Sequence, residues 1–238
     1  MNNLDPAIKS RDDNNLVIFI VMTLLKEKRI KIFLILLYFL SINLFAQLNN
    51  NVHPLTSQQQ SQMQNVCWYP NCPVQLNQLV MVTVPYWGFD NQTHQGIVVV
   101  NKKVANQVLD IFQMIYAAHF SIEKIKLIED YHGNDDLSMA DNNSSGFNCR
   151  NVANSKHFSL HSYGLAIDIN PLMNPYVREQ KVLPSVGRKY LNRAENLPGM
   201  IKKNDVVYLA FKKYHWTWGG DWAHLKDYGH FEKRINNE

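Results

Sequence analysis

Two short apolar runs lie close together near the start of the chain, at Leu16–Leu25 and Ile32–Leu40. The basic stretch between them would cost about 2.5–3.5 kcal/mol per charge at mid-bilayer, which disfavours one continuous membrane helix. Neither run alone reaches the roughly 20 residues that a spanning helix needs. A basic stretch, a short apolar stretch and then the small residue Ala46 are typical of a secretory signal. We predict a signal region over 1–46, cleaved after Ala46, with Met22 as its true start and an uncleaved membrane anchor as the alternative.

Asn, Gln and Ser dominate the chain after the signal region, as far as residue 65. A segment with so little apolar surface to bury is typical of a linker, so we predict that residues 47–65 form a flexible tether. From Val66 the composition becomes that of a packed domain, and we predict a single folded domain over residues 66–238.

Hydrophobic periodicity predicts the elements of this domain. Runs rich in Val and other apolar residues indicate strands, and apolar residues at helical spacing indicate amphipathic helices. The predicted strands are Leu79–Val84, Gly96–Val100, Ile122–Ile128, Leu165–Ile169 and Tyr228–Lys233, and the predicted helices are Lys102–Ala118 and Asp205–Tyr214. A polar loop is expected over Asn134–Asn148, and prolines mark a long connection from Pro171 to Pro198. Because strands and helices mix without a regular βαβ repeat, we predict an α+β domain with a mainly antiparallel sheet and flanking helices.

Composition and charge narrow the range of functions. The 238 residues are 46% hydrophobic and 18% charged, as in globular proteins, and the net charge is only +4. Such a small basic excess does not indicate nucleic-acid binding, so no nucleic-acid partner is predicted. The sequence also lacks a GxxxxGK(S/T) loop, a GxGxxG turn, an HExxH helix and a CxxC pair. Nucleotide-driven chemistry and thiol-rich metal sites are therefore disfavoured.

The sequence contains three cysteines, whose pairing depends on the cellular compartment of the protein. In an exported protein, Cys67 and Cys72 are close enough in sequence to form a disulfide around the turn at Pro70, which would leave Cys149 over. Three unpaired thiols are the alternative.

Two short segments hold the residues with catalytic potential: SLHSYGLAID over residues 159–168 and DYGHFE over residues 227–232. The glycine after His161 lets the chain fold back, so that the carboxylate of Asp168 faces the imidazole. His230 then supplies a third donor from a distant segment. Two imidazoles and one carboxylate, with a fourth position open to water, are the ligand set of a catalytic zinc site. We therefore predict a zinc ion bound by these three residues.

Two acidic residues near the third ligand have predicted roles of their own. Zinc lowers the pKa of its bound water towards about 7, and Asp227 can accept a proton from that water and pass it to the leaving amine. Glu232 is expected to support a ligand residue by hydrogen bonding.

The Ser-x-His-x-x-Gly-x-Ala-x-Asp and Asp-x-x-His patterns resemble those of the zinc D-alanyl-D-alanine carboxypeptidases (VanY-like) and the related L-alanyl-D-glutamate endopeptidases. The resemblance extends from Val66 to Lys233 and implies a hedgehog/DD-peptidase-like α+β fold with one zinc ion. The stretch Phe147–Arg150 is similar to the one that carries the family's substrate-positioning arginine. This similarity implies that Arg150 orients the scissile carbonyl or stabilises its oxyanion, and a surface ion pair is the alternative. Ser159 is expected to hold substrate or a neighbouring ligand residue.

The predicted function is that of an exported zinc metallopeptidase that hydrolyses peptidoglycan stem peptides in the periplasm or the extracellular cell envelope. The long Pro-rich connection resembles that of the D-alanyl-D-alanine carboxypeptidases, so we prefer this activity over that of the endopeptidases. Many of these carboxypeptidases carry Glu at the position of Asp227, and an Asp at this position resembles the endopeptidases. Two rival functions stay open, a zinc amidase acting on a different amide and a non-catalytic, zinc-stabilised envelope-binding module. Membrane contact is expected only through an uncleaved signal region.

Overall fold

The computed structural model describes residues 30–33, 51–153 and 155–235. The chain divides into a unit over residues 1–50 and a compact unit from Asn51 to Glu238. Residues 30–33 are helical, and the rest of the predicted signal region, with its cleavage site and expected start, lies outside the described residues. Within the described ranges, no helix has the length and apolar character needed to cross a bilayer.

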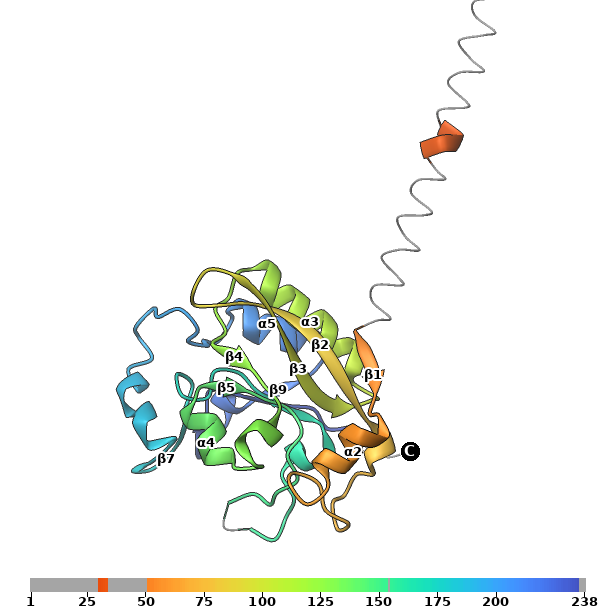
Figure 1. The fold of residues 1–238 in the computed structure, drawn as a ribbon. Helices are drawn as coiled ribbons and strands as arrows, with labels where there is room; N and C mark the ends of the chain where they lie inside the picture. Colours follow the sequence, from red (N-terminus) through yellow and green to blue (C-terminus); the bar gives the residue numbers. More distant parts are fainter. Residues whose placement is uncertain (1–29, 34–50, 154, 236–238) are drawn as a thin grey trace, which may run out of the picture. The chain divides into compact units, whose positions relative to one another are not determined.

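The compact unit contains short helices and strands in mixed order (Figure 1). Helices α2 to α5 are Ser57–Met63, Ala105–Ala117, Asp135–Ala140 and Val206–Lys213. Strands β1 to β11 are Val52–Pro54, Leu79–Trp87, Thr93–Asn101, Lys124–Ile125, Asn143–Ser144, Ala166–Asp168, Tyr176–Arg178, Lys181–Leu183, Thr217–Trp218, Lys226–Asp227 and His230–Glu232. The 3₁₀ helices η1 to η5 are Leu76–Gln78, Ile128–Tyr131, Leu160–Tyr163, Ser185–Tyr190 and Gly219–Asp221. The strands form three antiparallel sheets and one parallel pair, β4–β5, which confirms the α+β class.

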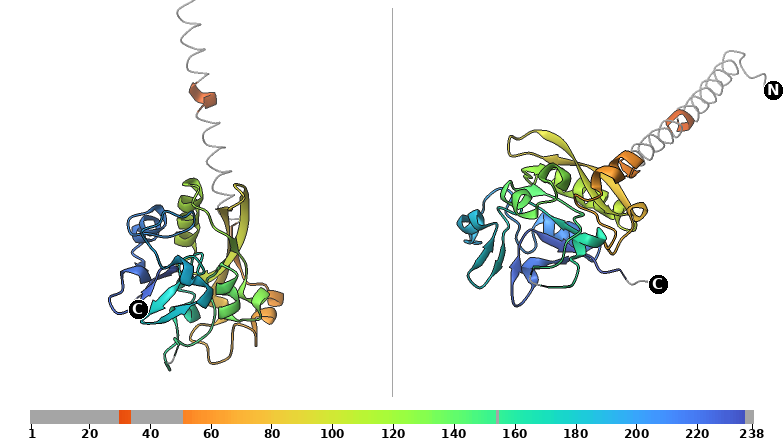
Figure 2. Two further views of the ribbon diagram at one scale, coloured as in Figure 1. Left: turned by 90° about the vertical axis from the view of Figure 1, so that its left-hand side faces the viewer. Right: turned by 60° about the horizontal axis from the view of Figure 1, so that its bottom comes forward.

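The longest strands, β2 and β3, form an antiparallel hairpin whose register pairs Leu79 with Asn101 and Trp87 with Thr93. Both strands and helix α3 confirm elements predicted from the apolar pattern. Helix α3 packs against β2 (Figure 2) and buries Val108, Ile111 and other apolar residues at helical spacing. This packing forms the part of the core on one face of the hairpin.

A smaller antiparallel sheet, in the order β6–β11–β9, carries part of the candidate site. Residues of β11 alternate between the core and the site, as the pleat of a strand requires. Phe231 is fully buried and stacks on Phe211 of α5 with 4.0 Å between ring centroids. His230 points away from this contact and lies opposite Asp168 in the register of β6 and β11. The core on one side of β11 therefore fixes the position of the site on the other.

The Pro-rich connection between Pro171 and Pro198 contains the β7–β8 hairpin and η4. Within the connection, the Arg193 guanidinium donates to the Met173 carbonyl and to the Asn174 side chain, each at 2.8 Å. A further bond to the Ile201 carbonyl at 2.7 Å joins the connection to the residues that follow it. Strand β10 pairs with β7, so the connection also supports the strand that ends at Asp227.

The structure corrects the predicted tether over residues 47–65. Residues 47–50 lie outside the described part, but β1 pairs with β2, and α2 begins at a capping box formed by Thr56 and Gln59. Met63 is almost fully buried in an apolar cluster with Leu55 and Phe147. A few apolar residues at suitable positions therefore fold this Gln-rich segment onto the domain, despite its polar composition.

The predicted Cys67–Cys72 disulfide is wrong. The structure pairs Cys72 with Cys149, whose Cα atoms lie 6.0 Å apart, and leaves Cys67 as a buried free thiol. The backbone N–H of Cys67 donates to the Met63 carbonyl at the end of α2, which turns the thiol into the apolar cluster. Cys149 lies beside this turn, because its N–H donates to the Cys67 carbonyl at 2.9 Å.

Two further local predictions differ from the structure. The polar stretch Asn134–Asn148, expected to be a loop, contains α4 and β5, and α4 starts where the Asn134 side chain accepts the N–H of Leu137. The strand expected over Ile122–Ile128 shortens to Lys124–Ile125. The capping Asn134 side chain explains why α4 starts at this place. The spacing of apolar residues alone does not predict this helix.

Candidate metal centre and active site

Three predicted ligand residues come together from three elements. His161 lies on η3, which ends at Gly164 in the left-handed conformation with φ of 66°. This turn leads the chain into β6, whose last residue is Asp168. His230 begins β11 and pairs directly with Asp168 across the sheet. The glycine turn and the strand register together bring residues 161, 168 and 230 to one point.

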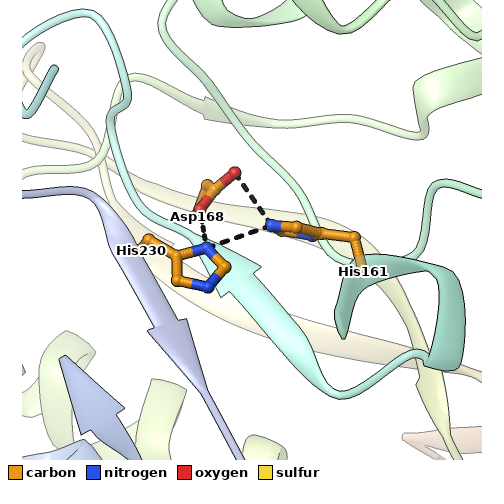
Figure 3. A group of neighbouring side chains, drawn as sticks. All are labelled: His161, Asp168 and His230. Carbon is orange, nitrogen blue, oxygen red and sulfur yellow. Dashed lines mark hydrogen bonds and ion pairs between the residues drawn. The ribbon is translucent and has the colours of Figure 1, made fainter. Parts of the chain in front are cut away.

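The donor atoms of this cluster lie within 4.8 Å of one another (Figure 3). The Nε2 atom of His161 is 3.2 Å from Nδ1 of His230 and 3.1 Å from Oδ2 of Asp168, and His230 Nδ1 is 2.9 Å from Asp168 Oδ1. All three residues are buried. A buried carboxylate between two imidazoles is the kind of donor set that binds a divalent cation.

Hydrogen bonds at the far side of each imidazole orient the ring. His161 Nδ1 donates to the Gly146 carbonyl at 2.6 Å, so its Nε2 lone pair is directed at Asp168 and His230. His230 Nε2 lies 3.3 Å from the Glu232 carboxylate, so its Nδ1 is the atom that faces the cluster. Such bonds fix the tautomer and raise the basicity of a metal-ligating histidine. The role expected for Glu232 agrees with this contact, whereas no sequence pattern indicates the role of Gly146.

The protonation states of the cluster reflect its crowded charges. Burial alone would raise the pKa of Asp168, but the imidazoles of His161 and His230 hold that pKa well below its usual value. Burial disfavours the charged form of His230, yet its bonds to Asp168 and Glu232 raise its pKa to about 10. The carboxylate is therefore ionised, and the proton on His230 occupies a position where a cation would replace it.

Asp227 is the last residue of β10 and is partly buried. Burial raises its pKa to about 7, against an opposing effect of His230. Its backbone is confined by Gly219, because a Cβ atom there would lie 2.5 Å from the Asp227 carbonyl oxygen and 2.8 Å from its Cβ. A carboxyl with a pKa near neutrality beside a metal-binding cluster can serve as a general base and acid.

Arg150 and Ser159 lie next to η3. The Arg150 guanidinium forms an ion pair with Asp135 of α4 at 2.9 Å, and its charge acts on the pKa of Asp227. Ser159 donates its backbone N–H to the Arg150 carbonyl at 3.0 Å, and its hydroxyl accepts the N–H of His161 at 3.3 Å. Ser159 therefore caps the turn that carries His161, and contact with substrate stays a prediction.

Several other conspicuous residues lie outside the donor cluster. The ring of Trp222 lies 5.4 Å from that of His230, between centroids, and Trp222 is partly exposed. Trp216 and Trp218 are buried in the core beside Phe211 and Phe231. Among the described residues, the cluster able to hold a metal ion consists of residues 161, 168 and 230, and it includes none of His157, His215 and His224.

The segment that carries the candidate site is similar to a known peptidase family. A family model described as D-alanyl-D-alanine carboxypeptidase matches residues 153–233, a segment that includes Ser159, both metal-site motifs and Asp227 but not Arg150. Neither a curated protein nor a solved structure matches the chain. The family match supports a hydrolytic peptidase of the D-alanyl-D-alanine carboxypeptidase type, acting on a peptide substrate.

Proposed function

We propose that this protein is a zinc metallopeptidase that hydrolyses an amide bond in peptidoglycan stem peptides. The observation that carries this proposal is the buried cluster of His161, Asp168 and His230, with donor atoms within 4.8 Å of one another. Its position inside the segment that matches the carboxypeptidase family supports it further. A hedgehog/DD-peptidase-like fold is part of the proposal.

The residues present fit a zinc ion. Two histidine nitrogens and one carboxylate oxygen are ordinary zinc ligands, and they leave a fourth position for water or substrate. The bonds from His161 to Gly146 and from His230 to Glu232 prepare both rings for a metal. Zinc bound here supplies a water ligand of low pKa and polarises the scissile carbonyl.

Asp227 handles the proton in this proposal. Its ionised carboxylate accepts a proton from the attacking water and then donates that proton to the nitrogen of the departing amine. The non-catalytic alternative, a zinc-stabilised binding module, has no need of a carboxyl with a pKa near 7 at this position. Arg150 donates hydrogen bonds to the substrate carbonyl as negative charge develops on its oxygen.

Two candidate bonds are favoured by different features. The family match and the long connection between Pro171 and Pro198 favour cleavage between the two terminal D-alanines. Asp rather than Glu at position 227 favours an L-alanyl-D-glutamate-type endopeptidase. We propose the carboxypeptidase activity and keep the endopeptidase activity as its rival.

Export to the cell envelope completes the proposal. The pattern of a basic stretch, an apolar stretch and Ala46 supports a signal region. A disulfide between Cys72 and Cys149 also supports an oxidising compartment, because such bonds are rare in the cytosol.

Product analysis tests the proposed function directly. Purified peptidoglycan fragments are incubated with the protein as prepared, with a chelator, and with the chelator followed by zinc, and the products are analysed by mass spectrometry. Loss of one C-terminal alanine, abolished by chelator and restored by zinc, is the expected result. Cleavage next to D-glutamate would replace the carboxypeptidase with the endopeptidase. Zinc binding with no product from any fragment would favour the binding module.

A further inference from the structure

The ion pair between Arg150 and Asp135 has no role in the proposed function so far. The Nη2 atom of Arg150 lies 2.9 Å from Oδ2 of Asp135, and both side chains are partly buried, with exposed fractions of 32% and 27%. Both charges act on the pKa of Asp227, the proposed base. An ion pair that is partly withdrawn from water holds its geometry better than a fully exposed one.

The backbone of Arg150 is fixed to the metal-binding turn independently of this ion pair. The Ser162 hydroxyl accepts the N–H of Arg150 at 2.8 Å and donates to the Arg150 carbonyl at 2.7 Å. Ser162 is fully buried and directly follows His161 on η3. The start of the Arg150 side chain is therefore held at a constant place relative to a metal ligand.

Asp135 sits on a well-anchored helix. Asn134 caps the start of α4, and the buried hydroxyl of Ser138 on the same helix accepts a hydrogen bond from Asn143 at 3.0 Å. Asn143 in turn donates to the Lys126 carbonyl at 3.2 Å. These bonds therefore hold the backbone of Asp135 more firmly than that of a residue on an exposed loop.

Arg150 still has an unused donor. A guanidinium carries five N–H groups, and the Nε–H of Arg150 is buried without a hydrogen-bond partner among the described residues. Because protein atoms cover this Nε, the exposed part of the side chain lies on its other atoms. The contact of Nη2 with Asp135 takes up one of the terminal N–H groups, and the others can donate to an oxygen atom of a bound peptide.

We propose that Asp135 is a positioning residue, which holds one end of the Arg150 guanidinium so that its other terminal N–H groups bind an oxygen of the substrate peptide. This inference rests on the proposed peptidase function. The oxygen belongs either to an amide carbonyl or to the C-terminal carboxylate of the peptide. Without Asp135 the guanidinium rotates among other conformers, and the peptide loses a directed donor near the reacting bond.

The test uses three variants of the full-length, zinc-loaded protein. Asp135→Asn removes the charge that holds Arg150, Asp135→Glu keeps it, and Asp136→Asn makes the same charge change at the exposed neighbouring position. We expect Asp135→Asn to lower kcat/KM for a stem pentapeptide about 10- to 100-fold, while Asp135→Glu recovers part of the loss and Asp136→Asn changes little. Zinc affinity and Tm of Asp135→Asn should equal those of Asp136→Asn, which separates positioning from a loss of folding.

A double-mutant cycle identifies Arg150 as the residue through which Asp135 acts. In an Arg150→Ala background, Asp135→Asn should have no further effect on kcat/KM. Full additivity of the two losses would overturn the inference. Comparing the pentapeptide acid with its C-terminal amide distinguishes the two oxygens: if the carboxylate is bound, only the acid loses affinity in Asp135→Asn.

A binding measurement separates failure of this inference from failure of the proposed function. The dissociation constant of the pentapeptide is measured in the Asp227→Asn background, with and without Asp135→Asn. Weaker binding with Asp135→Asn supports the inference even if the wild-type protein cleaves no peptide bond. Unchanged binding and unchanged kcat/KM overturn it while leaving the peptidase proposal intact. A protein that neither binds nor cleaves the pentapeptide overturns both.

Discussion

Each imidazole of the candidate metal centre is held by two contacts, one on the cluster side and one behind it. His161 donates backwards to a backbone carbonyl, and His230 contacts a carboxylate two residues along its own strand. The rings therefore have little freedom to turn away, and their inward nitrogens are directed at the point where a cation would bind. Preorganisation of this kind reduces the entropy lost when the metal binds.

The contact between His230 and Glu232 leads to a prediction about metal affinity. Replacing Glu232 by Gln leaves the size of the side chain unchanged but removes the negative charge behind the ring. We expect zinc affinity to fall about 10- to 100-fold, measured by competition with a chromophoric chelator. Arg234→Gln is the matched control, because Arg234 touches Glu232 only through an exposed ion pair of 3.8 Å. Equal affinities for the wild type and Glu232→Gln would show that the carboxylate does not tune the ligand.

Removal of the proposed base should separate catalysis from metal binding. Asp227→Ala takes away the proton acceptor but none of the three donors, so we expect hydrolysis to fall about 10²- to 10⁴-fold with zinc still bound at full stoichiometry. Stem-peptide turnover and metal content are measured on the same preparation. Unchanged turnover would remove Asp227 from the mechanism, and loss of zinc would mean that it supports the metal centre instead.

The pKa of Asp227 sets the sign of the pH dependence. Because burial raises that pKa to about 7, the carboxyl is protonated in mildly acidic solution and cannot accept a proton from water. A bound cation would lower the pKa, so we expect kcat/KM to decline at or below pH 7 and by roughly tenfold per pH unit beyond the midpoint. The profile is measured together with zinc content at each pH. Activity that stays constant down to pH 5 with zinc bound would contradict this assignment.

At the scale of elements, the site depends on places where backbone segments approach closely. A Cβ on Gly164 would lie 2.5 Å from the Asn101 backbone nitrogen, so the turn between the first two ligands packs directly on the end of β3. Gly219, at the start of η5, similarly touches the backbone of Asp227. The second contact bears on the proposed catalysis, because it confines the backbone that carries the proposed base.

Substituting Gly219 tests this dependence. In Gly219→Ala the added methyl group pushes against the Asp227 backbone, and we expect a loss of about 1–3 kcal/mol in stability together with a marked drop in kcat. Gly220→Ala is the matched control, because its methyl group would instead press on the Trp218 ring, at 2.3 Å. Denaturant unfolding and turnover are compared for both variants. If kcat falls equally in the two, the effect is general destabilisation and not displacement of Asp227.

Local patterns in the sequence account for part of the fold. The hairpin of β2 and β3 and helix α3 follow from runs of Val and from apolar residues at helical spacing, which are local signals. The convergence of His161, Asp168 and His230 follows from a glycine turn and from motif resemblance. Helix α4 and the packing of α2 do not follow from such patterns, because both segments have a polar composition. The Asn134 side chain caps α4, and the buried Met63 holds α2 on the domain.

Two other long-range pairings could not be predicted from the sequence. Whether Cys72 bonds Cys67 or Cys149 depends on how the end of α2 docks, and spacing favours the wrong partner. The pairing of Asp135 with Arg150 likewise depends on the position of α4, a helix that the polar pattern hides. Both contacts lie between segments whose relative placement only the packed core determines.

At the scale of the whole domain, the disulfide connects the N-terminal part to the segment that carries Arg150. Cys72 follows α2, and Cys149 directly precedes Arg150, 77 residues further along the chain. The bridge therefore closes a loop that contains β2, β3, α3 and α4. It links the residues that follow α2 to the segment that carries Arg150, so α2 belongs to the same folded unit as the candidate active site.

Loss of this disulfide should have a large effect on stability. In the chain-entropy account, opening a loop of this length costs about 4.5 kcal/mol, so we expect the Cys72→Ser, Cys149→Ser double variant to unfold at much lower denaturant concentration. Cys67→Ser is the control, since it keeps the bridge.

Thiol titration gives an independent check of the pairing. Burial raises the pKa of Cys67, so the native protein should react slowly with a thiol reagent, and the unfolded protein should show one thiol per chain. Peptide mapping that finds Cys67 joined to Cys72, or three reactive thiols after unfolding in protein isolated without reductant, would contradict the pairing and remove the covalent link between the N-terminal segment and Arg150.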